Sequence, residues 1–284
     1  MKISRRLLPL LLALSALAHG EGIVTTLRPL TLIANAVTQG VETPRQLLPD
    51  GVSAHDYSLK ASQRLALRQA TLVVRVGEHH ERFLAGILRD GDGVISLETL
   101  PGIRPLPLRG QDDLRPLPGT LDTHLWLQPA NAILLANAIA EARARKNPAR
   151  AADYRRNAQT FADALRQEEQ AQKTRFATLP QRRYVAWHDA WQYLEAPLGL
   201  QAIGSVSLSP EQKPGARHLL DLRRRMNDMQ ARCLLTEPLA DAGLIRQLAI
   251  PGLRTAAVDE TFSGAPDYRS GWRRMADAVY ACLR

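Results

Sequence analysis

The stretch PARAADYRRNAQTFADALRQEEQAQKTRFAT, residues 148–178, decides how this chain is organised. It is strongly helical in composition and about thirty residues long. A helix of that length, at ~1.5 Å of rise per residue, would extend on the order of 45 Å. That is long enough to cross a whole molecule, so we expect the helix to join two lobes. Another helical stretch, Pro129–Lys146, precedes it.

Strand and helix signals alternate on both sides of this helix. The strand signals before it are GIVTTL (22–27), a short run at 45–48, TLVVRVG (71–77) and VISLE (94–98), and a short helix is expected at 80–88. Those after it are RYVAWHD (183–189) and the runs at 202–208, 233–236 and 253–258. Such alternation indicates parallel sheets covered on both faces. We therefore predict an α/β protein of two lobes, residues 21–147 and 180–284, each a parallel sheet flanked by helices, joined by a long connecting helix at 148–179.

Residues 1–20 are expected to be a cleavable signal peptide. A positively charged start is followed by the almost wholly apolar run Leu7–Leu17 and by small residues at Ala18 and Gly20. This order is typical of secretory signals. A run of about a dozen apolar residues is also short for a membrane span. We expect cleavage after Ala18 or Gly20 and an exported protein; a retained anchor is the alternative.

The chain is basic, with a formal net charge of +9 that falls to about +6 (9 − 3) once Lys2, Arg5 and Arg6 leave with the signal. Arginine supplies most of the positive charge and is spread along helices, as in RARKNPARAADYRR (143–156). This is typical of solvated helix faces. A nucleic-acid site would instead need clustered basic residues with interleaved aromatics, so no nucleic-acid partner is expected.

Cys233 and Cys282 are the two cysteines of the chain. An even count in an exported protein favours a disulfide. Their separation is 49 residues (282 − 233), and closing such a loop is worth roughly 4 kcal/mol in chain entropy. The bridge would tie the last helix to a sheet. A metal-binding thiolate pair is the alternative.

Four residues stand at the ends of strands or in loops where parallel sheets bind ligands. His188 and Asp259 end the first and last strands of the second lobe, His55 follows a strand of the first, and His124 precedes the connecting helices. Three neutral imidazoles with a carboxylate or water make a natural tetrahedral zinc shell. The four residues are therefore candidate metal ligands.

The spacing of these histidines is no motif in itself, and a structural alternative stays open. His188 would then be a buried core residue between two tryptophans, and the other two histidines would be ordinary loop residues. Asp56 and Asp189 directly follow His55 and His188. Each could orient the imidazole ring or cap the next helix.

Five segments carry a resemblance to a known family. They are LLPDGVSAHDYSLKASQRLALRQATLVVRVG (47–77), DTHLWLQPANA (122–132), YVAWHDAWQYLEAPLGL (184–200), SLSPEQKPGARHLLDLRRRM (207–226) and CLLTEP (233–238). In this order they resemble the periplasmic zinc-uptake solute-binding proteins that serve ABC transporters, over nearly the whole mature chain. The resemblance implies a periplasmic, monomeric, non-enzymatic protein that captures Zn²⁺ between two lobes and delivers it to an ABC permease in the inner membrane.

The same resemblance implies roles for the candidate ligands. His55, His124 and His188 would bind zinc, and Asp259 stands at the place of the fourth ligand, where a water is the alternative. Manganese- and iron-type relatives usually carry a carboxylate at the third position and an aspartate at the fourth. A histidine at 188 therefore favours zinc, because imidazole suits zinc better than manganese.

The chain also departs from the family pattern. Zinc-type members often have a histidine- and acid-rich loop before the second ligand, whereas residues 97–123 contain no histidine. Some relatives have a glutamate where this chain has Ala54. We expect less metal scavenging by that loop and one potential ligand fewer.

Further polar residues lie near the predicted cleft. His79 and His80, in VGEHHERF, could be a solvent-exposed helix start or a secondary or transfer metal site. Glu237 could line the cleft without touching the metal. His218 is expected to be structural.

Other functions compete with zinc capture. The same fold could load manganese or iron, or act as an adhesin or metal chaperone without a permease. A zinc hydrolase would need a general base beside the metal, and the chain lacks an H-E-x-x-H signature. The long helix leads us to expect modest closure of the lobes on metal binding.

Overall fold

The structure, a computed structural model, describes residues 22–52, 54, 57–89, 91, 93–111, 113–207, 214–238 and 240–284. The predicted signal peptide lies outside this range, as do His55 and Asp56. Within the described range, no helix is long and apolar enough to cross a membrane.

Each half of the chain forms a four-stranded parallel sheet, as predicted. The first sheet contains, in spatial order, β2 (Arg45–Gln46), β1 (Ile23–Thr25), β3 (Leu72–Arg75) and β4 (Val94–Ser96). The second contains β6 (Gln201–Ser207), β5 (Arg183–His188), β7 (Cys233–Thr236) and β8 (Arg254–Ala257). The central strands β1, β3, β5 and β7 are buried throughout or nearly so, which explains their continuous apolar runs.

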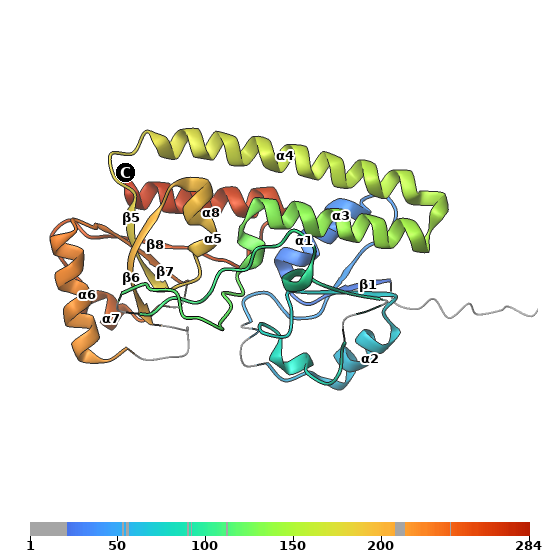
Figure 1. Ribbon diagram of the computed structural model, residues 1–284, viewed down its shortest axis with the longest axis horizontal. Helices are drawn as coiled ribbons and strands as arrows, with labels where there is room; N and C mark the ends of the chain where they lie inside the picture. The colour runs from blue at the N-terminus through green and yellow to red at the C-terminus, as the bar shows by residue number, and fades with distance from the viewer. Residues whose placement is uncertain are drawn as a thin grey trace, which may run out of the picture.

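Helices flank both sheets. Those of the first half are α1 (Arg28–Thr38), α2 (Ala61–Gln69) and α3 (Pro129–Lys146), and those of the second are α5 (Gln192–Leu198), α6 (Ala216–Asp228), α7 (Ala242–Gln247) and α8 (Tyr268–Leu283). Figure 1 shows α1 and α3 on one side of the first sheet and α2 on the other, with α8 and α6 on different sides of the second. The two-lobed α/β fold is therefore confirmed.

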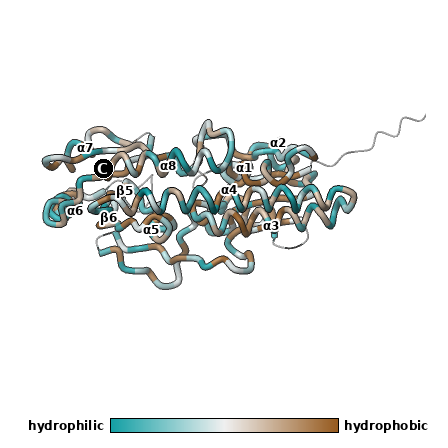
Figure 2. Tube along the Cα trace, turned by 90° about the horizontal axis from the view of Figure 1, so that it is seen from above, coloured by the Kyte–Doolittle hydropathy of each residue, from teal (hydrophilic) through white to brown (hydrophobic). Residues whose placement is uncertain are grey.

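The predicted connecting helix is α4 (Ala151–Ala177), preceded by a short 3-10 turn at Pro148–Arg150. Its 27 residues extend about 40 Å, and Figure 1 shows it running over both lobes. Polar and apolar residues alternate along it in Figure 2. The buried ones, which include Tyr154, Phe161, Leu165 and Phe176, recur at helical spacing and bury one stripe of the helix. The exact lobe boundaries, 147/148 and 179/180, stay a prediction.

The two lobes share one hydrophobic core. Leu30 and Leu127 of the first half belong to the same buried cluster as Tyr268 and Trp272 of the last helix. Trp272 donates its indole N–H to the carbonyl of Leu127 at 2.9 Å. The lobes are therefore joined by packed side chains as well as by the connecting helix.

The expected helix at residues 80–88 is largely absent, because only Arg82–Leu84 form a 3-10 turn. The carboxylate of Glu81 accepts hydrogen bonds from the backbone N–H groups of Val76 and Gly77, at 2.9 and 2.8 Å, and from the hydroxyl of Thr26. These bonds fold residues 76–81 into a tight turn at the end of β3. A periodic pattern could not reveal a turn held by one side chain.

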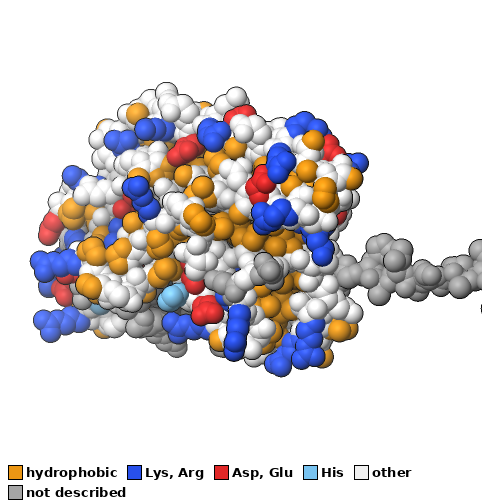
Figure 3. Space-filling model, turned by 45° about the vertical axis from the view of Figure 1, so that its right-hand side comes forward, with side chains coloured by type: hydrophobic (Ala, Val, Ile, Leu, Met, Phe, Trp, Pro, Cys, Tyr) orange, Lys and Arg blue, Asp and Glu red, His pale blue; other side chains and the backbone are white. Residues whose placement is uncertain are grey.

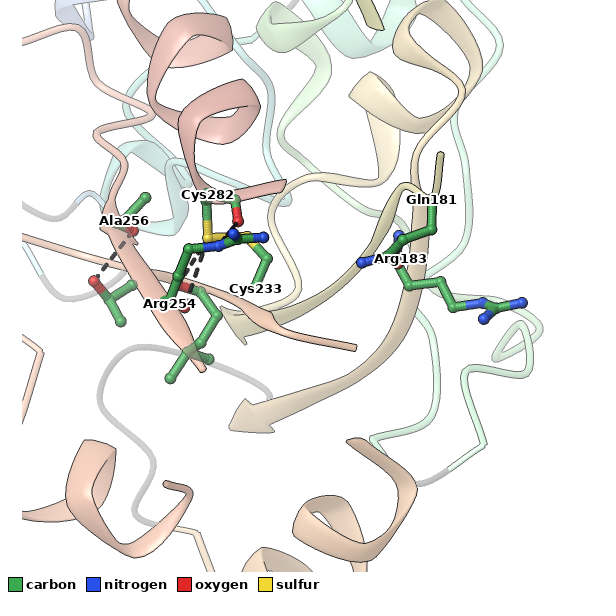
Figure 4. Close-up of a disulfide and its surroundings, with 8 residues drawn as sticks. Gln181, Arg183, Cys233, Arg254, Ala256 and Cys282 are labelled. Atoms are coloured by element: carbon green, nitrogen blue, oxygen red, sulfur yellow. Dashed lines mark hydrogen bonds between the residues drawn. A yellow bond between two sulfur atoms is a disulfide. The ribbon is translucent and has the colours of Figure 1, made fainter. Parts of the chain in front are cut away.

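The predicted disulfide joins Cys233, at the start of β7, to Cys282 on α8 (Figure 4), with Cα atoms 5.3 Å apart. Arg254 of β8 donates from Nε to the carbonyl of Cys282 at 2.8 Å. The bridge thus ties α8 to the amino-terminal end of the second sheet, away from the strand ends that carry polar residues.

A long irregular segment joins the first sheet to the second lobe. We call residues 104–122 the strap; residue 112 within it is not described. Its Arg109 forms paired hydrogen bonds to both Asp189 and Glu195, and Gln111 donates to the carbonyl of Val206 at 2.7 Å. The strap therefore anchors the first half of the chain on the second lobe.

Candidate metal site

A cavity of about 290 Å³ lies between the lobes. Its wall includes Leu27 and His80, which follow β1 and β3, and Glu237 and Asp259, which follow β7 and β8. Open parallel sheets bind ligands at this edge. The fold thus brings the carboxyl ends of both sheets to one cavity, as the sequence predicted.

His124 lies in the wall of this cavity, directly after the strap, and is buried. Its Nδ1 is 2.8 Å from Oδ1 of Asp122, which also accepts the backbone N–H of His124 at 3.1 Å. Asp122 is held by the second lobe: Gln192 donates to its carboxylate at 3.1 Å and the Tyr193 hydroxyl donates to its carbonyl at 2.8 Å. Asp122 therefore fixes the ring of His124 with Nδ1 occupied.

His188 ends β5 and is only 3% exposed. Its Nδ1 forms a short hydrogen bond to Oε1 of Glu237. Because β5 and β7 are adjacent parallel strands, the residue that ends β5 lies close to the residue that follows β7. Glu237, which the sequence placed in the cleft without contact to metal, lines the cavity and orients His188.

Asp189 does not have the role that its place next to His188 suggested. Its carboxylate accepts two hydrogen bonds from Arg109, at 2.7 and 2.6 Å, rather than one from the imidazole ring. Neighbours along an extended chain point to opposite sides, so Asp189 faces the strap while His188 faces Glu237 and His124, which line the cavity.

The Nε2 atoms of His124 and His188 are 3.3 Å apart. Two nitrogens each ~2.0–2.1 Å from a tetrahedral zinc ion would be separated by about 3.3–3.4 Å. In both residues a carboxylate holds Nδ1, which is the arrangement that fixes metal-binding imidazoles. The pair is therefore oriented to bind one ion through its two Nε2 atoms.

Carboxylates surround the two imidazoles and act against burial on the pKa of His188. Burial by itself would lower the pKa of His188, but the hydrogen bond to Glu237 and the negative charges of Glu260, Glu237 and Asp122 outweigh it and raise that pKa. Burial raises the pKa of Glu260, against the opposing charges of His188 and His124. An excess of carboxylates around two imidazoles favours a bound cation.

Asp259 lines the cavity directly after β8, as predicted. Its oxygens already accept hydrogen bonds from the backbone N–H groups of Thr261 and Ser263, both at 2.8 Å, and from the Thr261 hydroxyl. The side chain thus holds the turn after β8.

Glu260 also lines the cavity and was not among the predicted site residues. The signal was present as two adjacent carboxylates after the last strand, in VDE. The resemblance directed attention to the first of them alone. Which one faces the imidazoles depends on the turn after β8, which the sequence does not reveal.

His79 and His80 lie in different surroundings. The His79 side chain is 62% exposed, with Nδ1 3.2 Å from Oε2 of Glu98. His80 is 4% exposed and lines the cavity, with Nδ1 2.8 Å from the hydroxyl of Thr123. His218 lies on α6, where its Nε2 donates to the carbonyl of Ser205 at 2.8 Å.

His55 lies outside the described residues, although Val52 and Ala54 of the same loop line the cavity. Within the described ranges, no group of three or more His, Cys, Asp or Glu side chains is arranged to hold a metal ion. The geometry thus supplies two imidazoles in place, with nearby carboxylates.

Two α/β lobes around a cleft lined by histidines and carboxylates define the class of two-lobed metal-binding proteins. The chain belongs to the family described as "Zinc-uptake complex component A periplasmic", which matches residues 23–282. The resemblance inferred from the five segments is confirmed. The chain is thus a periplasmic component of high-affinity zinc uptake that binds Zn²⁺ as its cargo and works with an ABC permease; the manganese or iron alternative is not favoured.

Relatives agree in length and fold. The chain is 31% identical to a "High-affinity zinc uptake system protein ZnuA" of Yersinia pestis, covering 92% of this chain and 91% of that one. The solved structure titled "Crystal structure of ZnuA" superposes with a TM-score of 0.78 at 21% identity, covering 93% of this chain and 100% of that one. A mutant of a laminin-binding adhesin of Streptococcus agalactiae gives 0.80 at 20% identity, over 93% and 100%. At these identities the two structures support the fold alone.

Proposed function

We propose that the cleft binds one Zn²⁺ ion through His124, His188 and His55, with a carboxylate of the Asp259–Glu260 pair completing the shell. The observation that carries this proposal is the 3.3 Å separation of the two Nε2 atoms, with both rings held through Nδ1. His55 is included because its loop reaches the cavity at Val52 and Ala54.

Glu260 is the stronger candidate for the carboxylate ligand. The Asp259 oxygens accept three hydrogen bonds within their own turn. Glu260 is close enough to His188 and His124 for their charges to shift its pKa downward, against burial, which raises it. Zinc would neutralise this half-buried carboxylate, whose removal from water otherwise makes it costly to ionise.

The protein acts by binding alone, as a monomer and without a nucleic-acid partner. The two carboxylates that a hydrolase would use as a base, Asp259 and Glu237, are hydrogen-bonded to the turn and to His188. On the face seen in Figure 3, Lys and Arg side chains are scattered rather than gathered in one patch. The first observation supports binding without catalysis and the second supports the absence of a nucleic-acid partner, while the monomeric state rests on the family resemblance.

The test is the zinc affinity of the mature protein with His124→Ala and His188→Ala, measured by competition with a chromophoric chelator. Each substitution removes a ligand, so each should weaken binding by more than the roughly 10–100-fold that loss of an outer hydrogen-bond partner costs. The matched control is His218→Ala. It removes an imidazole of α6 that donates to the carbonyl of Ser205 in β6, so this variant should bind zinc with wild-type affinity. Wild-type affinity in either ligand variant would rule out this site.

Comparison of Glu260→Gln with Asp259→Asn then identifies the fourth ligand. We expect Glu260→Gln to lose more affinity for zinc than Asp259→Asn. The reverse order would assign the ligand to Asp259, as the sequence predicted.

A further inference from the structure

Arg28 stands where the first lobe meets the turn after β8. It is the first residue of α1, and its side chain is 23% exposed. Its Nε and Nη2 donate to the backbone carbonyls of Phe262 and Ala265, at 3.1 and 2.6 Å. These two residues belong to the second lobe, 234 and 237 residues further along the chain. One guanidinium group therefore bridges the two lobes.

The same guanidinium also contacts the loop after β2. Its Nη1 is 3.2 Å from Oδ2 of Asp50, whose other carboxylate oxygen accepts a hydrogen bond from Gln46 of β2 at 2.8 Å. Arginine presents its donors in a planar fork and is not deprotonated in proteins, so it can hold one carboxylate and two carbonyls together. We call these contacts of Arg28 with Asp50, Phe262 and Ala265 the latch.

The latch lies at the wall of the metal cavity. Residues that flank or closely follow Arg28, Asp50 and Phe262 in the chain line that cavity. They are Leu27 and Pro29, Gly51 and Val52, and Thr261 and Ser263. Each pair comes from a different segment, so Arg28 fastens three parts of the wall to one another.

The turn after β8 needs such a fastening. Phe262 has a φ of 57°, in the left-handed region that a bulky side chain occupies only where its surroundings fix it. Its carbonyl accepts from Arg28, and Trp126 of the first lobe donates its indole N–H to the carbonyl of Glu260 at 2.8 Å. The positions of Asp259 and Glu260 thus depend on groups of the first lobe.

We propose that Arg28 is a positioning residue that keeps the cavity closed around the bound metal and so slows the release of Zn²⁺. This inference rests on the proposed function, because the turn that Arg28 holds carries the carboxylate assigned to the zinc. Opening the cavity on this side breaks the two hydrogen bonds to the turn, whereas the ion pair with Asp50 lies within the first lobe and persists. The carbonyl contacts should therefore matter more than this ion pair, whose aspartate side chain is 41% exposed.

The test measures zinc release from the mature protein into an excess of chromophoric chelator by stopped-flow absorbance. Methionine keeps the apolar stem of Arg28 but none of its donors. Arg28→Met should therefore release zinc about tenfold faster than wild type, at the lower end of what loss of an outer hydrogen-bond partner costs in affinity. Asp50→Asn leaves both carbonyl contacts in place and should change the rate by less than about threefold.

The matched control is Arg150→Met. Arg150 also pairs with an aspartate, Asp153, at 2.8 Å and donates to a carbonyl, that of Gly40, at 3.3 Å. These three residues are not among the described residues that line the cavity. The control should therefore release zinc at the wild-type rate.

A wild-type release rate in folded Arg28→Met would overturn the latch and leave the proposed function intact, and so would an equal acceleration in Arg150→Met. Wild-type affinity in His188→Ala would instead defeat the proposed function. A merely structural Arg28 would lower the free energy of unfolding in urea without changing the release rate. If Arg28→Met does not fold, Arg28→Lys decides. Its ammonium group keeps the charge opposite Asp50 but lacks the planar fork, so zinc should still leave faster than from wild type, and an unchanged rate overturns the proposal.

Discussion

The Nε2 atoms of His124 and His188 lie within hydrogen-bonding distance of each other where the metal is expected to bind. Both Nδ1 atoms face carboxylate oxygens and therefore carry hydrogens, so a hydrogen bond between the two Nε2 atoms needs one further proton. The raised pKa of His188, caused by Glu237 and the other carboxylates against the effect of burial, agrees with this extra charge. Zinc would take the place of that proton.

The pH dependence of zinc binding follows from this at the residue level. The pKa of His188 in the folded protein is raised above its ordinary 6.5. Protonation of His188 therefore stabilises the metal-free fold fully below pH 6.5. This stabilisation is lost as the pH rises through the raised pKa. Zinc affinity should therefore start to fall at a pH above 6.5 as the solution is acidified. Glu237→Gln removes the carboxylate whose hydrogen bond contributes most to raising the pKa of His188, so the fall should begin at lower pH, and affinity at high pH should drop by about 10–100-fold.

Chelator competition between about pH 5.5 and 8.5 measures both effects, since this range spans imidazole titration. Asp189→Asn is not a neutral control, because Asp189 binds Arg109; His79→Asn serves instead. Identical pH profiles for wild type and Glu237→Gln would contradict the role given to Glu237.

The residues of the site show what a sequence can and cannot locate. His188 and Asp259 lie at or directly after strand ends, as expected, because strand order fixes those positions, and His124 and Asp259 line the cavity; their role as metal ligands stays a prediction. The partner of His188, Glu237, was missed because it follows β7, 49 residues away in the chain, and the contact depends on which strands are neighbours. Glu260 was missed because the direction of a side chain after a strand depends on the turn that follows.

Among the elements, the long helices and the parallel strands were the most predictable, since periodicity and apolar runs continue over many residues. Pro129–Lys146 begins and ends where predicted. The helix expected at 80–88 was wrong because the buried carboxylate of Glu81 binds the backbone N–H groups of Val76 and Gly77 and bends the chain there. Such local competition leaves no periodic trace in the sequence.

The disulfide acts on the last helix and not on the metal. Replacing both Cys233 and Cys282 by serine frees a loop of 49 residues and should lower the free energy of unfolding by about 4 kcal/mol. Urea unfolding of the metal-free protein measures this loss. Zinc affinity should stay at the wild-type value, because the bridge lies at the amino end of β7 while Glu237 follows its carboxyl end. A loss of zinc binding in folded protein would show that α8 helps to position the site.

At the level of the whole molecule, three features join the lobes: α4, the shared hydrophobic core and the strap. Two-lobed proteins with slender hinges close widely around their ligands, but closure here would have to break packed contacts between the lobes. We therefore expect the radius of gyration from X-ray scattering to change by less than about 0.5 Å when zinc binds. A decrease well beyond that would show that the shared core opens.

Arg109→Ala tests the strap within the same experiment. It leaves the half-buried carboxylates of Asp189 and Glu195 without their cation. Breaking a fully buried pair typically costs about 3–5 kcal/mol of stability, so we expect a loss below that range. Because the strap also leads to Asp122 and His124, the variant should bind zinc more weakly and close further than wild type, in addition to unfolding at lower urea concentration. Arg109→Lys keeps the charge but not the paired hydrogen bonds to both carboxylates, so an intermediate effect is expected. Arg109→Ala could instead lower stability and leave both zinc affinity and the scattering change at wild-type values. In that case the strap stabilises the second lobe alone, and α4 with the shared core limits the closure of the lobes.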